Sequence, residues 1–203
     1  MNLPNKLTFL RILLVPFFVA AMLIQFPLHY LVALALFSIA SLTDLFDGKI
    51  ARKNDLVTNF GKFSDPLADK ILVMSALLCM VQLGLCDCII VIVVLFREFA
   101  VTSVRLLAAS EGKVVAANIW GKVKTVTQIV AIIAILALQI ALEIINIAFP
   151  TVPAEYTIGL IAAYNLDFIF YLIGEILLWI STVFCIISGV IYLKDNKQFI
   201  SME

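Results

Sequence analysis

The sequence predicts an all-α integral membrane protein with six transmembrane helices, and three observations support this fold class. Hydrophobic residues make up 64% of the 203 residues and charged residues only 14%, against about 45–50% and 25% in soluble domains. The apolar residues form runs of about 20, each able to cross a hydrocarbon core of roughly 30 Å as a helix. Backbone polar groups in lipid must be satisfied internally, which favours helices. The six expected helices are 7–26, 30–52, 66–83, 88–109, 123–147 and 168–193.

The N-terminal region is expected to stay with the mature chain. The run 7–26 follows a basic residue, but no small-residue cleavage pattern comes after it, so we expect a retained first span. Residues 2–6, with Pro4 suited to a first helical turn, are expected to form a short amphipathic helix along the membrane surface. Because no internal repeat or low-complexity tract divides the chain, residues 1–203 are expected to form a single membrane domain.

The basic residues predict the orientation in the membrane. The connections 27–29, 84–87 and 148–167 contain no Lys or Arg. The excess of positive charge at the other helix ends places those ends, and both termini, in the cytoplasm. We therefore expect a multi-pass protein of the inner (cytoplasmic) cell membrane whose active site faces the cytoplasm. The basic residues assigned to this side are Lys6, Arg11, Lys49, Arg52, Lys53, Lys62, Lys113, Lys122, Lys124, Lys194 and Lys197.

The net charge and the cysteine spacing argue against a nucleic-acid-binding function and against a zinc site or disulfide. The formal net charge is zero, which argues against a general nucleic-acid binder. Cys79 and Cys185 lie inside apolar runs, and Cys86 and Cys88 have no second pair beside them. With one histidine in the chain, free thiols are favoured over a zinc site or a disulfide.

Four aspartates form the most informative group. Asp44 and Asp47 are near the inner end of the second expected helix, and Asp65 and Asp69 are near the inner start of the third. An antiparallel hairpin brings all four carboxylates to one membrane boundary. Such a cluster needs a counter-charge beside lipid. Two divalent cations about 3.5–4 Å apart supply it and suit phosphoryl transfer.

Structural interpretations of the same residues stay open at this point. Asp65, directly before Pro66, is a ready helix N-cap. Asp44 and Asp47 could be solvated residues at a helix end. Gly48 could allow a ligand close to the backbone, or could pack between helices as membrane glycines often do.

The spacing of these residues resembles a known family. Residues 44–52 read Asp-x-x-Asp-Gly-x-x-Ala-Arg, and after eight residues 61–69 read Gly-x-x-x-Asp-x-x-x-Asp. This pattern resembles the CDP-alcohol phosphotransferase signature at every fixed position. The resemblance implies that Asp44, Asp47, Asp65 and Asp69 hold two Mg²⁺ or Mn²⁺ ions on the CDP diphosphate, and that Asp69 is also the general base. The CDP-binding residues that it implies are Asn5, Thr8, Asp44, Asp47, Gly48, Arg52 and Thr58.

A second basic group predicts the acceptor site. Arg97 and Glu98 lie in the middle of an apolar run, with Arg105 two turns later. Ionisable residues at membrane depth are costly and face the bundle interior or a wet cavity. Arginines suit phosphate oxygens, so we expect Arg97, Arg105, Lys122 and Lys124 to bind the phosphate of an anionic acceptor. The alternative is that Arg97 and Glu98 are partnered structural charges.

The acceptor itself is implied by resemblance. Residues 97–105 and 121–128 are similar to segments of those family members that transfer a phosphatidyl group from CDP-diacylglycerol to glycerol 3-phosphate in the lipid bilayer. Inositol phosphate, serine or another alcohol is the alternative within the family, and a divalent-ion transporter is the alternative outside it. A transporter predicts the acids near the bilayer midplane, whereas Asp47 precedes Arg52 at the membrane edge by five residues. A homodimer is expected. The last third of the chain has no assigned role.

Overall fold

The computed structural model describes the backbone of residues 3–53, 59–113, 118–148 and 157–199, with side chains except at 3–7, 44–66, 69 and 157–165. Within these ranges there are six α-helices, one 3₁₀ turn and no strand. The elements are α1 (Leu3–Leu23), α2 (His29–Lys53), α3 (Asn59–Gln82), α4 (Cys88–Ser110), α5 (Ile119–Ala148), α6 (Thr157–Asp195) and η1 (Lys197–Phe199).

Each of the six apolar runs coincides with one of these helices to within three residues at its C-terminal end, which confirms the all-helical fold class. By length and composition, Ile119–Ala148 and Leu166–Asp195 can cross a membrane. The apolar parts of α1, α2 and α3 are shorter, covering Thr8–Leu23, His29–Thr43 and Lys70–Gln82. These helices fit a membrane protein.

Three expected boundaries are wrong. Helix α3 begins at Asn59, so Asp65 lies inside the helix and is not its N-cap. Helix α6 begins at Thr157 and has 39 residues, so much of the expected loop 148–167 is helical. Helix α1 runs unbroken from Leu3, without a separate amphipathic helix in the described residues. At α1 and α3, backbone hydrogen bonding continues the helix into polar residues that an apolar run does not include. The added part of α6, residues 157–167, is mostly apolar but is interrupted by Gly159, Asn165 and Asp167.

The start of α4 follows the local sequence closely. Asp87 has extended backbone angles (φ −71°, ψ 136°), and its side chain accepts a hydrogen bond from the Ile89 backbone N–H at 3.0 Å. An aspartate in this position satisfies an N–H that has no partner within the helix. The connection before it turns at Gly84, whose φ of 71° suits glycine.

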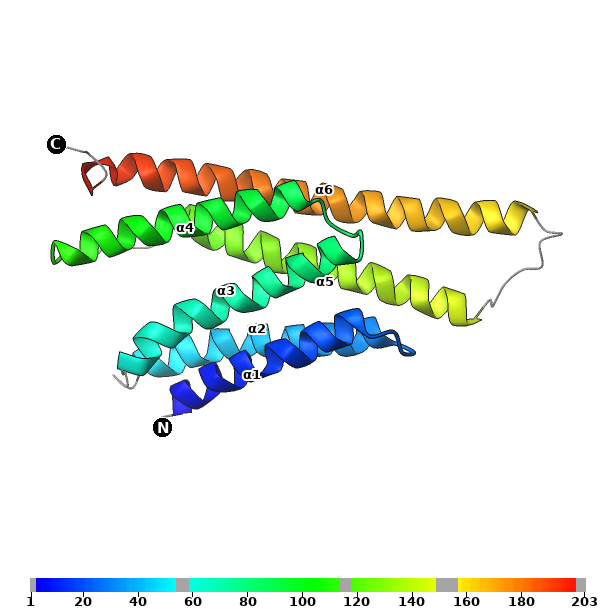
Figure 1. Cartoon of the computed structure of the whole chain (residues 1–203), viewed down its shortest axis with the longest axis horizontal. Helices are drawn as coiled ribbons and strands as arrows, with labels where there is room; N and C mark the ends of the chain where they lie inside the picture. The colour runs from blue at the N-terminus through cyan, green and yellow to red at the C-terminus, as the bar shows by residue number, and fades with distance from the viewer. Residues whose placement is uncertain (1–2, 54–58, 114–117, 149–156, 200–203) are drawn as a thin grey trace.

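The helices form an elongated bundle with its connections at two ends. Helix α1 begins, and α6 ends, at the end where α2 leads to α3 and α4 leads to α5 (Figure 1). The other end holds the α1–α2 and α3–α4 connections, the end of α5 and the start of α6, and α5 and α6 extend furthest there (Figure 1). Helix α1 packs on α2 and α3, α5 packs on α6 and α2, and α4 packs on α6.

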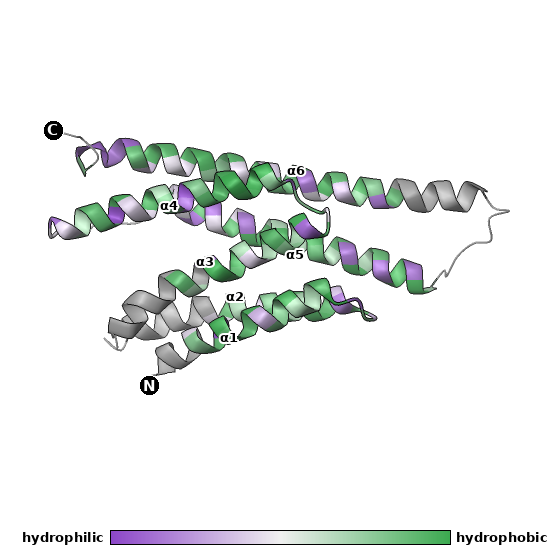
Figure 2. Cartoon of the chain, viewed as in Figure 1, coloured by the Kyte–Doolittle hydropathy of each residue, from purple (hydrophilic) through white to green (hydrophobic). Residues whose placement is uncertain are grey.

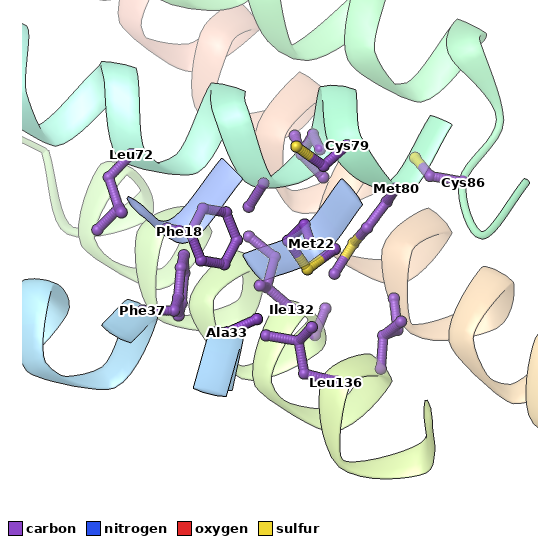
Figure 3. Close-up of a cluster of buried hydrophobic side chains, with 14 of the residues drawn as sticks. Phe18, Met22, Ala33, Phe37, Leu72, Cys79, Met80, Cys86, Ile132 and Leu136 are labelled. Carbon is purple, nitrogen blue, oxygen red and sulfur yellow. The ribbon is translucent and has the colours of Figure 1, made fainter. Parts of the chain in front are cut away.

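The main core contains buried residues of all six helices, and Figure 3 labels residues of α1, α2, α3 and α5 in it. Phe18 and Phe37 are fully buried, with ring centroids 5.7 Å apart and an interplanar angle of 47°. Met22 and Met80 fill the adjacent space, as unbranched thioether side chains do in irregular gaps. This packing fixes the positions of α2 and α3, the two helices that carry the four aspartates.

Large apolar side chains also cover the outside of the bundle. Phe96 is 73% exposed, Phe17 59% and Ile92 61%. Figure 2 shows that hydrophobic colouring dominates the described ribbon of every helix. Soluble monomers rarely expose contiguous apolar surface on this scale, so this surface suits contact with lipid tails.

Candidate active site

The four aspartates lie on two helices that meet at one end of the bundle. Asp44 and Asp47 are in α2, and Asp65 and Asp69 are in α3. Only residues 54–58 separate the last residue of α2 from the first residue of α3. The side chains of all four lie outside the described residues, so the structure describes their helices and not their carboxylates. Four carboxylates on adjoining helix ends are the hard oxygen donors that divalent cations prefer.

A cavity of about 540 Å³ opens beside these aspartate-bearing segments. Its wall includes Ser41, three residues before Asp44, and Lys70, the residue after Asp69. Residues of all six helices contribute to the lining. The cavity is therefore bounded by the helix segments next to both halves of the aspartate motif.

The lining of this cavity is strongly basic. Its described ionisable side chains comprise one acidic residue, Glu98, and six basic residues. Such a surface attracts anionic groups, because positive charges in a partly enclosed space reinforce one another. The basic residues are Arg11, Lys70, Arg97, Arg105, Lys122 and Lys124.

Three of the cations surround the Glu98 carboxylate. The Arg97 guanidinium donates to Glu98 Oε1 at 2.7 Å, and Lys124 Nζ donates to the same oxygen at 2.8 Å. Lys70 Nζ lies 3.9 Å from Glu98 Oε2 and also donates a hydrogen bond to the Thr102 hydroxyl. The structural alternative, in which Arg97 and Glu98 are partnered charges, is thus present, and the pairing includes Lys124 of α5 and Lys70 of α3.

Helix α6 completes the wall around Arg97. The second guanidinium nitrogen of Arg97 donates to the Ser188 hydroxyl at 2.6 Å. Gly189 follows directly, and a Cβ atom there would meet the Arg97 Cγ atom at 2.9 Å. The absence of a side chain at Gly189 allows α6 to approach the arginine of α4.

Arg105 and Lys122 differ from the other basic residues of the cavity. The Arg105 guanidinium carbon lies 5.7 Å from the centroid of the Tyr192 ring, within the range of cation–π attraction. Neither Arg105 nor Lys122 forms an ion pair with any residue in the described parts of the chain. These two cations are both exposed and line the cavity.

The predicted acceptor residues are therefore brought together, since Arg97, Arg105, Lys122 and Lys124 all line the same cavity. Among the predicted CDP-binding residues, Thr8 is fully buried in α1. The backbones of Asn5, Gly48 and Arg52 lie in helices, but their side chains are not described. Thr58 lies outside the described residues. The four cysteines form no disulfide with one another.

Sequence reasoning missed several lining residues. Lys70 could have been found, because it is an ionisable residue directly after Asp69 at the start of an apolar run. Ser188 and Tyr192 carried no signal, because serine and tyrosine are ordinary residues of membrane helices. No group of three metal-ligating side chains occurs in the part of the chain whose side chains are described. The aspartate motif lies outside that part.

Comparisons with known proteins identify the family. The model of the CDP-alcohol phosphatidyltransferase family matches residues 1–187. A CDP-diacylglycerol–glycerol-3-phosphate 3-phosphatidyltransferase of Bacillus subtilis is 41% identical, covering 97% of this chain and 96% of that relative. A protein of the same name from Rickettsia bellii is 36% identical, covering 98% and 97%. The match spans the aspartate motif and all six basic residues of the cavity, and on this ground the chain belongs to the CDP-alcohol phosphatidyltransferase family.

Proposed function

We propose that this protein transfers the phosphatidyl group of CDP-diacylglycerol to the hydroxyl of sn-glycerol 3-phosphate, producing phosphatidylglycerophosphate and CMP. The names of its similar relatives support these two substrates. The observation that carries the proposal is the basic cavity bounded by Ser41 and Lys70, beside the two aspartate pairs. The described ionisable side chains of the lining, six basic and one acidic, fit an anionic acceptor better than a neutral alcohol.

The aspartates are proposed to hold the divalent metal on which this family depends. Asp44, Asp47, Asp65 and Asp69 would bind two Mg²⁺ or Mn²⁺ ions. When bound, these ions neutralise charge on the diphosphate and on the departing CMP. Asn5, Thr8, Gly48, Arg52 and Thr58 are proposed to contact the CDP portion, as the family motif implies.

The reaction is a single displacement at phosphorus. The acceptor hydroxyl oxygen forms a bond to the phosphorus that carries the diacylglycerol, and the bond from that phosphorus to the CMP oxygen breaks. CMP leaves with the electron pair, and the Asp69 carboxylate takes the hydroxyl proton. Arg105 and Lys122 bind the acceptor phosphate, which holds the hydroxyl in place for attack.

The membrane arrangement is proposed from the helix bundle and the basic residues. All six helices would cross the inner membrane, with both termini and the cavity on the cytoplasmic side. The acyl chains of CDP-diacylglycerol would enter between helices from the inner leaflet. A homodimer is proposed because the helices are rich in small residues, which allow close helix–helix approach.

The proposal is tested by measuring CMP release from purified protein in detergent with CDP-diacylglycerol and Mg²⁺. Glycerol 3-phosphate, inositol phosphate, inositol and serine are compared as acceptors, with Asp69→Asn as the inactive control. We expect release with glycerol 3-phosphate alone. CMP release with another acceptor would be consistent with the proposed metal site but would overturn the assignment of glycerol 3-phosphate as the acceptor. Metal binding by folded protein without release from any acceptor would favour an ion transporter instead.

A further inference from the structure

Glu98 joins three helices through their basic side chains. Its carboxylate accepts hydrogen bonds from Arg97 at 2.7 Å and from Lys124 at 2.8 Å, and it lies 3.9 Å from Lys70 Nζ. These cations belong to α4, α5 and α3. One carboxylate is therefore shared among three positive charges at the wall of the cavity.

This cluster is only slightly exposed. The exposed fractions of the side chains are 8% for Lys124, 12% for Arg97 and 17% for Glu98, while Lys70 is 35% exposed. Charge–charge interactions are strong in such a setting, because little water screens them. Three cations share the single Glu98 carboxylate, so the described cluster has a net positive charge.

We propose that Glu98 is a positioning residue that keeps Arg97 and Lys124 hydrogen-bonded to its own carboxylate. Their positive charge is then partly neutralised, and the cavity binds a phosphate group weakly enough for it to be released after each reaction cycle. This inference rests on the proposed function, in which the cavity receives the acceptor phosphate. The predicted direct contact of Arg97 and Lys124 with that phosphate is thereby revised. Arg105 and Lys122 bind the phosphate, while Arg97 and Lys124 act through Glu98.

The proposed role and a purely structural role predict opposite changes in anion affinity when the Glu98 charge is removed. Loss of a structural pair disorders the site and weakens binding of every ligand. Loss of the Glu98 charge leaves the cations in place, because glutamine still accepts a hydrogen bond from one of them. The cavity then has one more uncompensated positive charge, and anions bind more tightly while exchanging more slowly.

The experiment measures inhibition by inorganic phosphate in the CMP-release assay with glycerol 3-phosphate. For Glu98→Gln, we expect the inhibition constant for phosphate to fall roughly five- to tenfold, from the loss of one nearby negative charge in a poorly screened site. We also expect KM for glycerol 3-phosphate and kcat to fall. Glu98→Asp keeps the charge and is expected to stay within about twofold of the wild type.

The matched control is Glu111→Gln, the same chemical change in an exposed ion pair with Lys113, whose atoms lie 3.2 Å apart. Surface ion pairs contribute little, so this variant should behave as the wild type. Combining Glu98→Gln with Lys124→Met restores the net charge, and phosphate inhibition should return toward the wild-type value. If Glu98→Gln alone fails to fold, the double variant still tests the proposal. Wild-type phosphate inhibition is expected from its restored net charge, whereas loss of a structural ion pair would weaken the inhibition.

Three outcomes are distinguished. Tighter phosphate inhibition in Glu98→Gln, reversed in the double variant, supports the proposal. Unchanged or weaker inhibition in folded Glu98→Gln overturns it, as does unreversed inhibition in the double variant. Wild-type enzyme that phosphate does not inhibit competitively with glycerol 3-phosphate contradicts the proposed acceptor site itself.

Discussion

Gly189 of α6 packs so closely on Arg97 of α4 that a Cβ atom at position 189 would lie 2.9 Å from the Arg97 Cγ atom. The far end of this arginine is held by Glu98 at 2.7 Å and by Ser188 at 2.6 Å. Because both ends of the side chain are fixed, Arg97 cannot move away from an added methyl group without losing a hydrogen bond. The contact between α4 and α6 therefore depends on glycine.

Overpacking at Gly189→Ala is expected to cost about 1–3 kcal/mol, which is partly offset by the roughly 1 kcal/mol that alanine gains over glycine in a helix. The net effect is a destabilisation of up to about 2 kcal/mol and a lower kcat/KM. Gly121→Ala is the matched control, since its Cβ atom would lie 3.6 Å from the Arg97 NH2 atom, an ordinary contact. Thermal unfolding in detergent measures both, and equal stability of the two variants would contradict the packing argument.

Arg105→Gln is expected to raise KM for glycerol 3-phosphate about 10- to 100-fold, because hydrogen bonds to charged groups contribute about 1.5–3 kcal/mol. The effect on kcat should be smaller, since Arg105 is proposed to bind the acceptor and not to act on the phosphorus. Lys113→Gln removes an exposed cation that does not line the cavity. Steady-state kinetics with both variants checks the prediction, and a shared rise in KM would argue against a specific role of Arg105.

Two variants of Tyr192 separate the contribution of its ring to acceptor binding from that of its hydroxyl group to stability. The ring faces the Arg105 guanidinium at 5.7 Å, whereas the buried hydroxyl has no hydrogen-bond partner in the described part of the chain. Tyr192→Phe should keep KM and equal or exceed wild-type thermal stability, because an unsatisfied polar group is removed. Tyr192→Leu should raise KM about two- to fivefold, from loss of about 0.5–1 kcal/mol of cation–π attraction. Equal KM in both variants would exclude this role for the ring.

Removal of divalent ions with EDTA is expected to abolish CMP release, and Mg²⁺ or Mn²⁺ should restore it. Asp44→Asn, Asp47→Asn and Asp65→Asn should each raise the metal concentration needed for half-maximal activity at least tenfold, because each removes a ligand charge. Asp87→Asn is the matched control. Asp87 caps the start of α4, and asparagine is about as good an N-cap as aspartate, so this variant should keep the wild-type metal requirement. Activity that persists without divalent ions would refute the proposed metal site.

The cysteines test both reactivity and orientation. Burial, together with the nearby Glu175, Asp87 and Cys88, raises the pKa of the Cys86 thiol to about 12. A raised pKa favours the neutral thiol, so at pH 9 roughly one molecule in a thousand carries the reactive Cys86 thiolate. Cys88 is exposed, whereas Cys79, Cys86 and Cys185 are buried. A maleimide should therefore label Cys88 alone at neutral pH.

With the proposed orientation, a membrane-impermeant maleimide labels Cys88 in intact cells. Lys113→Cys, combined with Cys88→Ser, places a thiol near the other end of α4 and should react only after the membrane is opened. Labelling measured by mass shift decides between the two sides. The opposite pattern would reverse the orientation without affecting the assignment of the site.

The sequence predicted the helices well where lipid contact requires apolar residues. The apolar run 88–109 became α4 (Cys88–Ser110) almost residue for residue. The start of α3 was missed because the residues that extend this helix, 59–65, are largely polar and carry no signal of lipid contact. The start of α6 was missed although residues 157–167 are mostly apolar, because Gly159, Asn165 and Asp167 interrupt the run. The aspartate spacing predicted the family, which the match over residues 1–187 confirms.

Residue types and their spacing along the chain thus determined the helical fold class, the aspartate motif and the general location of the basic residues. The tertiary structure decided which cations form an ion pair with Glu98 and which line the cavity without an ion pair in the described parts of the chain. Arg97 and Ser188 are 91 residues apart in sequence yet share a hydrogen bond, and Lys124 meets Glu98 from another helix. Electrostatic and hydrogen-bond energies depend on distances of a few ångströms, and helix packing sets those distances.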